Sequence, residues 1–213
     1  MSNENIIHTE IRGHVSARLI SPSVKKNKIP IGNALISFFP KGANVFEVAS
    51  GTGEHAIHFC GLRPDIHWQP SDPDSESRKS QDEWSRDFRE QINLSYNIST
   101  LEPNWADLLR GYDIVFCANM IHIAPWSATV GLIEGSYSIL KRFGMLVLYG
   151  PFLDGKKSEN SNLRFDEKLK SKNSCWGVRE INDISNISGV YGFELFETIN
   201  MPSNNKILIF KKL

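Results

Sequence analysis

The end of the chain contains two strand-like segments that are too close in sequence to pair in parallel. Phe193–Ile199 and Ile207–Phe210 are rich in aliphatic and aromatic residues, and only residues 200–206 separate them. A connection between parallel neighbours needs a dozen or more residues. The two segments therefore predict an antiparallel hairpin, which excludes a wholly parallel sheet.

Upstream of this hairpin, strand-like and helix-like segments alternate. Short apolar runs predict strands at 44–49, 66–71, 92–98, 113–118 and 145–149. Helical spacing of apolar residues predicts helices at 31–39, 55–62, 74–90 and 130–140. Such alternation implies crossover connections and a parallel sheet that is covered on both faces. The expected fold class is α/β, with a Rossmann-like sheet that is mostly parallel and has one reversed strand.

The first thirty residues and the overall charge indicate the domain organisation and restrict the classes of partner that are expected. Residues 1–30 are polar and contain Pro22 and Pro30, which predicts a poorly structured lead-in or cap before a single domain at 31–213. Lys plus Arg and Asp plus Glu both number 24, so no general attraction to nucleic acid or an anionic membrane is expected. Three separated cysteines and the lack of a signal-like apolar stretch predict a cytoplasmic protein. The sequence does not predict an oligomeric state.

A glycine-containing segment, Glu47-Val48-Ala49-Ser50-Gly51-Thr52-Gly53-Glu54-His55, lies between the first predicted strand and a helix. Glycines allow the backbone to approach a ligand closely, and the start of a helix offers free N–H groups. Asp72 ends the second predicted strand 19 residues after Gly53, where a carboxylate can bind the ribose hydroxyls of an adenosine. The arrangement predicts a cofactor site rather than an unliganded turn.

Two cofactors are compatible with this segment. Gly51-x-Gly53-x-x-Ala56 fits the nicotinamide fingerprint, and Tyr137 and Lys141 have the spacing of the catalytic pair in short-chain dehydrogenases. Glu47 followed by Gly51 and Gly53 equally resembles motif I of class I methyltransferases, except that Ala49 stands where that family usually has glycine. Residues 140–146 also resemble the turn that precedes the fifth methyltransferase strand. Together with the hairpin, this turn favours a methyltransferase over an oxidoreductase.

Six further segments make the resemblance more specific than class I methyltransferases in general. In chain order they are WQPSD at 68–72, NMIH at 119–122, YGPF at 149–152, SN with FD within 161–166, WGVR at 176–179 and MPxNNK at 201–206. They resemble a little-characterised family of methyltransferase-like proteins that includes methyltransferase-like protein twenty-six of animals and many bacterial homologues. The resemblance runs from about Arg18 to the C-terminus and implies a seven-stranded class I methyltransferase sheet. Two positions depart from the family: residues 26–31 read KNKIPI instead of the frequent RNREPI, and Asn97 replaces a usual Asp.

The resemblance implies an enzyme that uses S-adenosylmethionine and transfers its methyl group by direct displacement to an unidentified small-molecule acceptor. It assigns the methionine part of the cofactor to Glu47, Ala49 and Gly51. The ribose is assigned to Asp72 and the adenine to Asn97, and Asn119 is expected to face the methyl group. The predicted cofactor site also includes Ser50, Gly53, His55 and Met120.

His122 is the candidate general base, because it follows the fourth predicted strand and imidazole titrates in a suitable range. A hydrogen-bonded histidine that orients the loop is an equal alternative. The substrate pocket is predicted to be shaped by Tyr149, Asn162, Asp166, Trp176 and Arg179, and Trp176 is equally well explained as a core anchor.

No metal site is predicted, since His55 and His58 share a helix face without further ligands at metal spacing. The expected partner is a small molecule rather than a protein, and neither nucleic acid nor membrane is expected. A catalytically silent methyltransferase fold that binds a cofactor or a partner protein stays open as an alternative.

Overall fold

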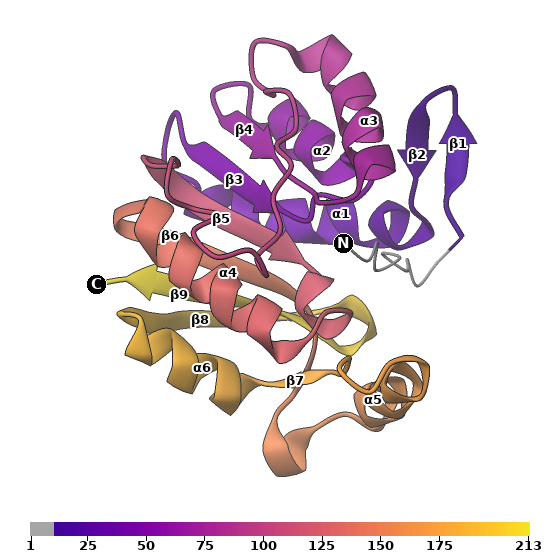
Figure 1. Cartoon of the computed structure of the whole chain (residues 1–213), viewed down its shortest axis with the longest axis vertical. Coiled ribbons are helices and arrows are strands. Elements are labelled where there is room, and N and C mark those ends of the chain that lie inside the picture. The colour runs from indigo at the N-terminus through magenta and orange to yellow at the C-terminus, as the bar shows by residue number, and fades with distance from the viewer. Residues whose placement is uncertain (1–10) are drawn as a thin grey trace.

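A mixed sheet of seven strands forms the centre of the computed structural model, which describes residues 11–213 (Figure 1). Its strands are β3 (Asn44–Val48), β4 (His67–Pro70), β5 (Tyr112–Ala118), β6 (Leu140–Leu153), β7 (Arg179–Glu180), β8 (Phe193–Met201) and β9 (Asn205–Lys212). The strand order is β4-β3-β5-β6-β9-β8, and β7 pairs with the end of β6. β3, β4, β5 and β6 are parallel, so their carboxyl ends meet at one edge.

Helices cover both faces of this sheet. They are α1 (Pro22–Leu35), α2 (Glu54–Leu62), α3 (Ser75–Trp84), α4 (Trp126–Ile139), α5 (Asn160–Lys172) and α6 (Ile181–Val190). Short 3₁₀ turns occur at Ile36–Phe38, Ser85–Phe88, Met120–His122, Gly155–Lys157 and Pro202–Asn204. In Figure 1, α4 and α6 lie in front of the sheet and α1 runs behind it. A separate small hairpin pairs β1 (Gly13–Val15) with β2 (Arg18–Ile20). Within residues 11–213, no helix combines the length and apolar character needed to cross a membrane.

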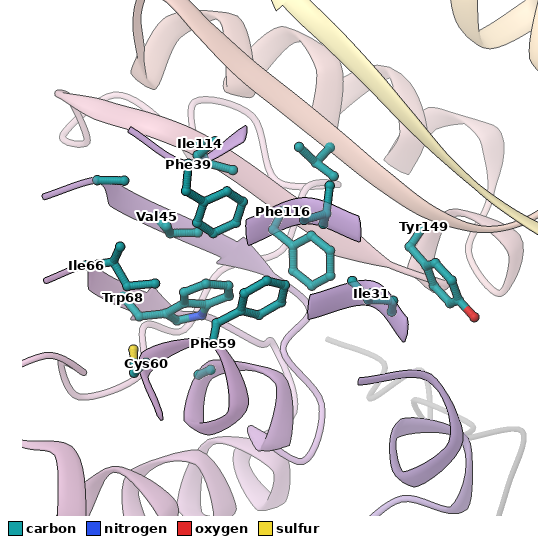
Figure 2. Packing of buried hydrophobic residues seen from close by; sticks show 14 of the residues in the cluster. Ile31, Phe39, Val45, Phe59, Cys60, Ile66, Trp68, Ile114, Phe116 and Tyr149 are labelled. Atoms are coloured by element: carbon teal, nitrogen blue, oxygen red, sulfur yellow. The ribbon is translucent and has the colours of Figure 1, made fainter. Parts of the chain in front are cut away.

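An aromatic cluster fastens α2 to the sheet. Phe59 of α2 stacks on Phe39 and Trp68, with ring centroids 5.3 and 5.1 Å apart. Phe116 of β5 meets the same Phe59 ring edge-on at 5.8 Å. Figure 2 shows these rings packed between the helix and the strands, with Tyr149 at the end of the cluster. Because buried rings in such contacts resist displacement, the cluster fixes where α2 begins relative to the carboxyl edge of the sheet.

The fold class expected from the sequence is confirmed. β8 and β9 form the predicted antiparallel hairpin, and β9 also pairs antiparallel with β6. The chain therefore has a mostly parallel sheet with a reversed strand from its C-terminal hairpin. The seventh strand is the short β7, which the sequence did not predict.

The predicted strand at 92–98 is not a regular strand. Only two isolated parallel bridges are formed there, between Trp68 and Ile92 and between Ser71 and Tyr96. The backbone carbonyl of Leu94 instead accepts a hydrogen bond from the Gln69 side chain at 2.8 Å. Residues 92–98 therefore lie beside β4, as predicted, but they do not form a continuous ladder of backbone hydrogen bonds with it.

The prediction that residues 1–30 are poorly structured is wrong for residues 11–30. The β1–β2 hairpin forms there, and α1 begins at Pro22, so the predicted domain boundary at residue 30 falls inside a helix. Ser21 caps the first turn of α1 with its side chain, and proline is well suited to the first helical position. α1 then continues through Pro30. The earlier part of the predicted lead-in lies outside the described residues.

We expect Phe116→Ala to lower the free energy of unfolding by about 3–5 kcal/mol, since removing a buried ring leaves a cavity. Phe116 is 0% exposed and meets the rings of His55, Phe59 and Trp68 edge-on. Phe196, which is 54% exposed, provides the control: Phe196→Ala should cost less than about 0.5 kcal/mol. Urea denaturation measures both, and equal losses would contradict this description of the core.

Candidate active site

The turn between β3 and α2 contains three residues with left-handed backbone conformation. Ala49, Gly51 and Gly53 have φ angles of 55°, 56° and 89°. Gly53 precedes the first residue of α2, and a Cβ at this position would lie 3.0 Å from the Cα of Gln81. Glycine avoids both the steric cost of positive φ and this close approach. Ala49 lacks that advantage, so its conformation is strained.

Asp72 holds this turn in place from the end of β4. Its carboxylate accepts hydrogen bonds from the backbone N–H groups of Gly51 and Asp74, each at 2.9 Å. Asp72 is 5% exposed, and burial raises the pKa of its carboxyl group to about 6 despite these hydrogen bonds and the nearby Arg12. The site thus contains a buried acid with strong hydrogen-bonding capacity directly beside the left-handed turn.

A cavity of about 1270 Å³ opens at the carboxyl edge of the parallel strands. Pockets for a single small ligand usually measure roughly 300–1000 Å³, so this one has room for more than one. α1 covers it from one side through Asn27 and Pro30, and α5 lines another side with Asn162 and Phe165. In open α/β sheets, ligands bind at this edge.

Most of the predicted cofactor residues line this cavity. The lining includes Ala49, Ser50, Gly51, His55, Asp72, Asn119 and Met120. Asn119, directly after β5, also has left-handed backbone with a φ of 63°. The sequence therefore identified segments from three strand ends that the fold brings together.

Glu47 and Gly53 lie behind the cavity lining. Glu47 is buried; its carboxylate accepts a hydrogen bond from the indole N–H of Trp68 at 2.9 Å and lies 3.7 Å from Nδ1 of His55. It supports His55, which does line the cavity. Gly53 is held in the turn by its close packing on Gln81.

Asn97, the predicted adenine partner, also lies outside the cavity lining. Its side-chain oxygen accepts a hydrogen bond from Arg78 at 3.1 Å in an exposed position. The next five residues, 98–102, line the cavity instead. The assignment of Asn97 to the adenine stays a prediction, and the structure places its side chain on Arg78 instead of in the cavity lining.

Some of the predicted substrate residues line the cavity, and the others lie behind its wall. Tyr149, Asn162 and Trp176 line the cavity. Asp166 instead accepts hydrogen bonds from the Val178 backbone N–H at 2.9 Å and from Lys170 at 2.6 Å. It therefore shapes the wall from behind.

Arg179 is likewise directed to the backbone rather than into the cavity. Its guanidinium donates hydrogen bonds to the carbonyl oxygens of Ile121 at 2.9 Å, Ala124 at 2.6 Å and Cys175 at 3.1 Å. These bonds join the segment after β5 to the segment before β7. Arg179 thus fixes the loop that carries His122.

His122 lines the cavity and is 1% exposed. Neither ring nitrogen has a hydrogen-bond partner within residues 11–213. Burial, with a smaller contribution from the charge of Arg179 and against an opposing contribution from the Gly177 backbone, lowers the pKa of the imidazole to about 3. The ring is therefore neutral at physiological pH. Its backbone carbonyl accepts a hydrogen bond from Gly177 at 3.0 Å, so the loop is oriented through the main chain.

Asn27 is a site residue that the sequence reasoning did not single out. Its side-chain oxygen lies 3.0 Å from Nε2 of His55, and its side chain also bonds to the hydroxyl of Tyr149. All three residues are buried and line the cavity. The sequence could have indicated Asn27, because it is shared with the family segment that residues 26–31 resemble. The residues on either side of it, Lys26 and Lys28, differ from that segment and argued against a role for it.

The alternative catalytic pair is not assembled at this cavity. Tyr137 packs edge-on against Phe193 at 5.7 Å, and Lys141 forms an ion pair with Asp113 at 2.8 Å. Neither residue lines the cavity. In the described part of the chain, no group of three or more His, Cys, Asp or Glu side chains is arranged to hold a metal ion.

Residues 18–212 match the model of a family whose description is "Protein of unknown function (DUF938)". The chain belongs to this family. The match covers every segment of the cavity lining except Arg12, so the site described here is a feature of the DUF938 region itself.

Solved structures with the same fold as this DUF938 chain include several methyltransferases. The pyocyanin biosynthetic protein PhzM is 14% identical, with a TM-score of 0.74 over 90% of this chain and 56% of that chain. Human N-acetylserotonin methyltransferase in complex with SAM is 18% identical, with a TM-score of 0.71 over 89% of this chain and 52% of that chain. An O-methyltransferase family protein from Burkholderia thailandensis is 12% identical, with a TM-score of 0.76 over 89% and 57%. The chain spans little more than half the length of each, and the likeness establishes a shared fold.

Ala49→Gly is expected to leave the free energy of unfolding unchanged or to raise it by up to about 1 kcal/mol. Glycine relieves the left-handed strain at residue 49, which offsets its greater freedom in the unfolded chain. The matched control, Ala56→Gly within α2, should cost about 1–2 kcal/mol through lost helix propensity and lost burial. Chemical denaturation of both variants measures the difference; similar costs would be inconsistent with the left-handed turn.

Proposed function

We propose that this protein is a methyltransferase that uses S-adenosylmethionine and acts on a small-molecule acceptor, close to the methyltransferase-like protein twenty-six family. The observation that carries the proposal is the contact between Asp72 and Gly51 at the head of the cavity. It supplies a ribose-binding acid beside a left-handed turn, at the edge where open α/β sheets bind ligands.

The residues present fit this cofactor. The left-handed backbone at Gly51 lets a ligand approach where a side chain would intrude, and the Asp72 carboxylate can accept hydrogen bonds from two ribose hydroxyls. Residues 98–102 are available to enclose the adenine, since they line the same cavity. When bound, the cofactor supplies a methyl group on an activated sulfonium, so the protein mainly orients the reactants and excludes water.

Asn119 and His122 are the residues that we propose act on the acceptor. Both line the cavity after β5, on the opposite side of β3 from Asp72. The lowered pKa of His122 makes proton capture by this ring weak at neutral pH. We therefore assign His122 to hydrogen bonding and orientation of the acceptor, a role that differs from both sequence hypotheses, a general base and a histidine that orients the loop.

Several observations support this function over its alternatives. An oxidoreductase of the short-chain type would need Tyr137 and Lys141 at the cofactor, and both lie away from the cavity lining. A silent binding protein would not need an unpartnered imidazole in the cavity wall. The fold-sharing proteins N-acetylserotonin methyltransferase and mitomycin 7-O-methyltransferase are named after small molecules, which supports an acceptor of that size. A cytoplasmic protein without a nucleic-acid partner remains part of the proposal.

Calorimetric titration of the purified protein with S-adenosylmethionine, S-adenosylhomocysteine and NAD tests the proposal. We expect micromolar binding of the first two and at least about a tenfold loss in Asp72→Ala, since the ribose loses its charged hydrogen-bond acceptor. Asp113→Ala, which removes an acid paired with Lys141 away from the cavity, is the control and should bind normally. Binding of NAD alone would replace the methyltransferase by an oxidoreductase, and no binding would favour a silent fold.

The affinity for S-adenosylhomocysteine should depend on pH through Asp72. Because burial raises the pKa of this carboxyl group to about 6, it is ionised above pH 6 and accepts protons below it. Protonation removes the negative acceptor, so the affinity should be constant from pH 7 to 8 and fall by up to about tenfold per pH unit below 6. Titrations at several pH values measure this, with Asp72→Asn as a pH-insensitive reference. An affinity that stays constant down to pH 5 would contradict the ribose assignment.

A further inference from the structure

His122 has hydrogen-bonding capacity that the protein leaves unused. Neither buried ring nitrogen makes a hydrogen bond of regular geometry within the described chain, although the Gly177 backbone lies near enough to the ring to oppose part of the lowering of its pKa. The residue nevertheless lines the cavity. A neutral imidazole carries one N–H donor and one acceptor nitrogen. Leaving buried polar atoms unpaired costs free energy, because each atom has lost its hydration without gaining a partner. A ligand that bonds to this ring would recover that free energy.

A second polar group lies beside the ring. Gly150 approaches Nε2 of His122 so closely that no side chain fits at residue 150, and the Asn119 side-chain oxygen would lie 3.4 Å from a Cβ built there. The side-chain oxygen of Asn119 accepts hydrogen bonds, whereas Nε2 of the neutral His122 ring donates one when it carries the proton. A hydroxyl group both donates and accepts, so it can bond to Asn119 and His122 together.

The walls around His122 come from three parts of the fold. Phe152 at the end of β6 meets the His122 ring edge-on at 5.2 Å. Asn162 of α5 donates a hydrogen bond to the Phe152 carbonyl at 3.0 Å, and Gly177 donates one to the His122 carbonyl at 3.0 Å. β6, α5 and the segment before β7 therefore enclose one end of the cavity.

This end of the cavity contains no ionic side chain among the residues described. The acidic and basic residues of the lining are Arg12, Lys26, Asp72 and Glu102. None of them belongs to residues 119–125, β6, α5 or residues 173–176. The same end presents the aromatic side chains of Phe165 and Trp176, and Ile123 packs against the small apolar cluster that includes Trp176. Arg179 lies behind this wall, and its guanidinium is already bonded to three backbone carbonyl oxygens. A cation placed here would lose its hydration and meet that positive charge, and an anion would find no cationic side chain in the lining itself. A neutral ring would bury its faces against apolar walls.

We propose that this end of the cavity is the acceptor subsite, and that it takes an uncharged aromatic ring whose hydroxyl group bonds to His122 and Asn119. The inference rests on the methyltransferase function and adds the chemical class of the acceptor. His122 acts in it as a hydrogen-bonding group that positions the hydroxyl oxygen. Methylation of this oxygen releases the hydroxyl proton, which goes to water because the neutral ring takes up protons only weakly. The N–H donor of the ring stabilises the negative charge that develops on the oxygen as the proton leaves.

The test uses full-length protein saturated with S-adenosylhomocysteine and four matched probes: methyl 4-hydroxybenzoate, methyl benzoate, the 4-hydroxybenzoate anion and the tyramine cation. Calorimetry measures binding of each. We expect methyl 4-hydroxybenzoate to bind at least about tenfold more tightly than the other three, the equivalent of one recovered hydrogen bond or one avoided ion burial. An imidazole ¹⁵N shift of His122 in the NMR spectrum should accompany its binding.

Variants separate the subsite from the rest of the molecule. His122→Phe keeps a ring but removes both nitrogens, so it should abolish the preference for the hydroxyl over methyl benzoate while S-adenosylhomocysteine still binds. His67→Phe changes an exposed histidine of β4 and should preserve the preference. Equal binding of all probes, preference for an ion, or no binding of any probe would overturn the subsite. Failure to bind S-adenosylhomocysteine is a different result, which would reject the proposed function itself.

Discussion

The hydrogen bond from the Gly51 N–H to the Asp72 carboxylate is the contact on which the site depends, because it joins the ends of two neighbouring strands. Backbone and side-chain bonds reinforce it: Ser50 donates to the Ser71 carbonyl at 2.8 Å, and the Ser71 hydroxyl donates to the Glu47 carbonyl at 2.7 Å. Together they hold the turn after β3 in a left-handed form that is unfavourable for alanine. The carboxylate is buried in the process, which raises its pKa to about 6. The protein thus keeps a desolvated acid beside the left-handed turn, where the proposed cofactor would place its ribose hydroxyls.

A second set of polar contacts joins the covering helix to this edge. His55 at the start of α2 lies between Glu47, which is 3.7 Å from Nδ1, and Asn27 of α1, which is 3.0 Å from Nε2. Asn27 also bonds to the Tyr149 hydroxyl, and Figure 2 shows that hydroxyl directed away from the aromatic cluster. Buried polar groups need such partners, so α1 can be placed in only a few ways over the cavity. Glu47, the acid of the turn motif, contributes through His55 instead of lining the cavity.

The features that were predictable from sequence are those set by local pattern and chain length. Strand and helix alternation located the sheet, and the seven residues between the last two strands required a hairpin. The start of α1 was missed because Pro22 and Pro30 were interpreted as breaks. Pro22 occupies a favourable first-turn position, and burial of Ile31 on the same helix compensates the cost of Pro30. The places of Asp166 and Arg179 depend on hydrogen bonds to distant backbone atoms, which no local pattern specifies.

The two ends of the cavity differ in charge, and this difference is suited to methyl transfer. The end that contains Asp72 has ionic groups and backbone donors for a polar, charged cofactor. The end that contains His122 has neutral polar groups and apolar walls. When a methyl group moves from a sulfonium to a hydroxyl oxygen, positive charge leaves the ionic end of the cavity. Fixed dipoles stabilise such moving charge better than water does, because water must reorganise around it. A neutral imidazole and an amide beside the acceptor are dipoles of this kind. On this argument, a neutral His122 suits the proposed methyl transfer, because a positively charged ring at this position would repel a sulfonium.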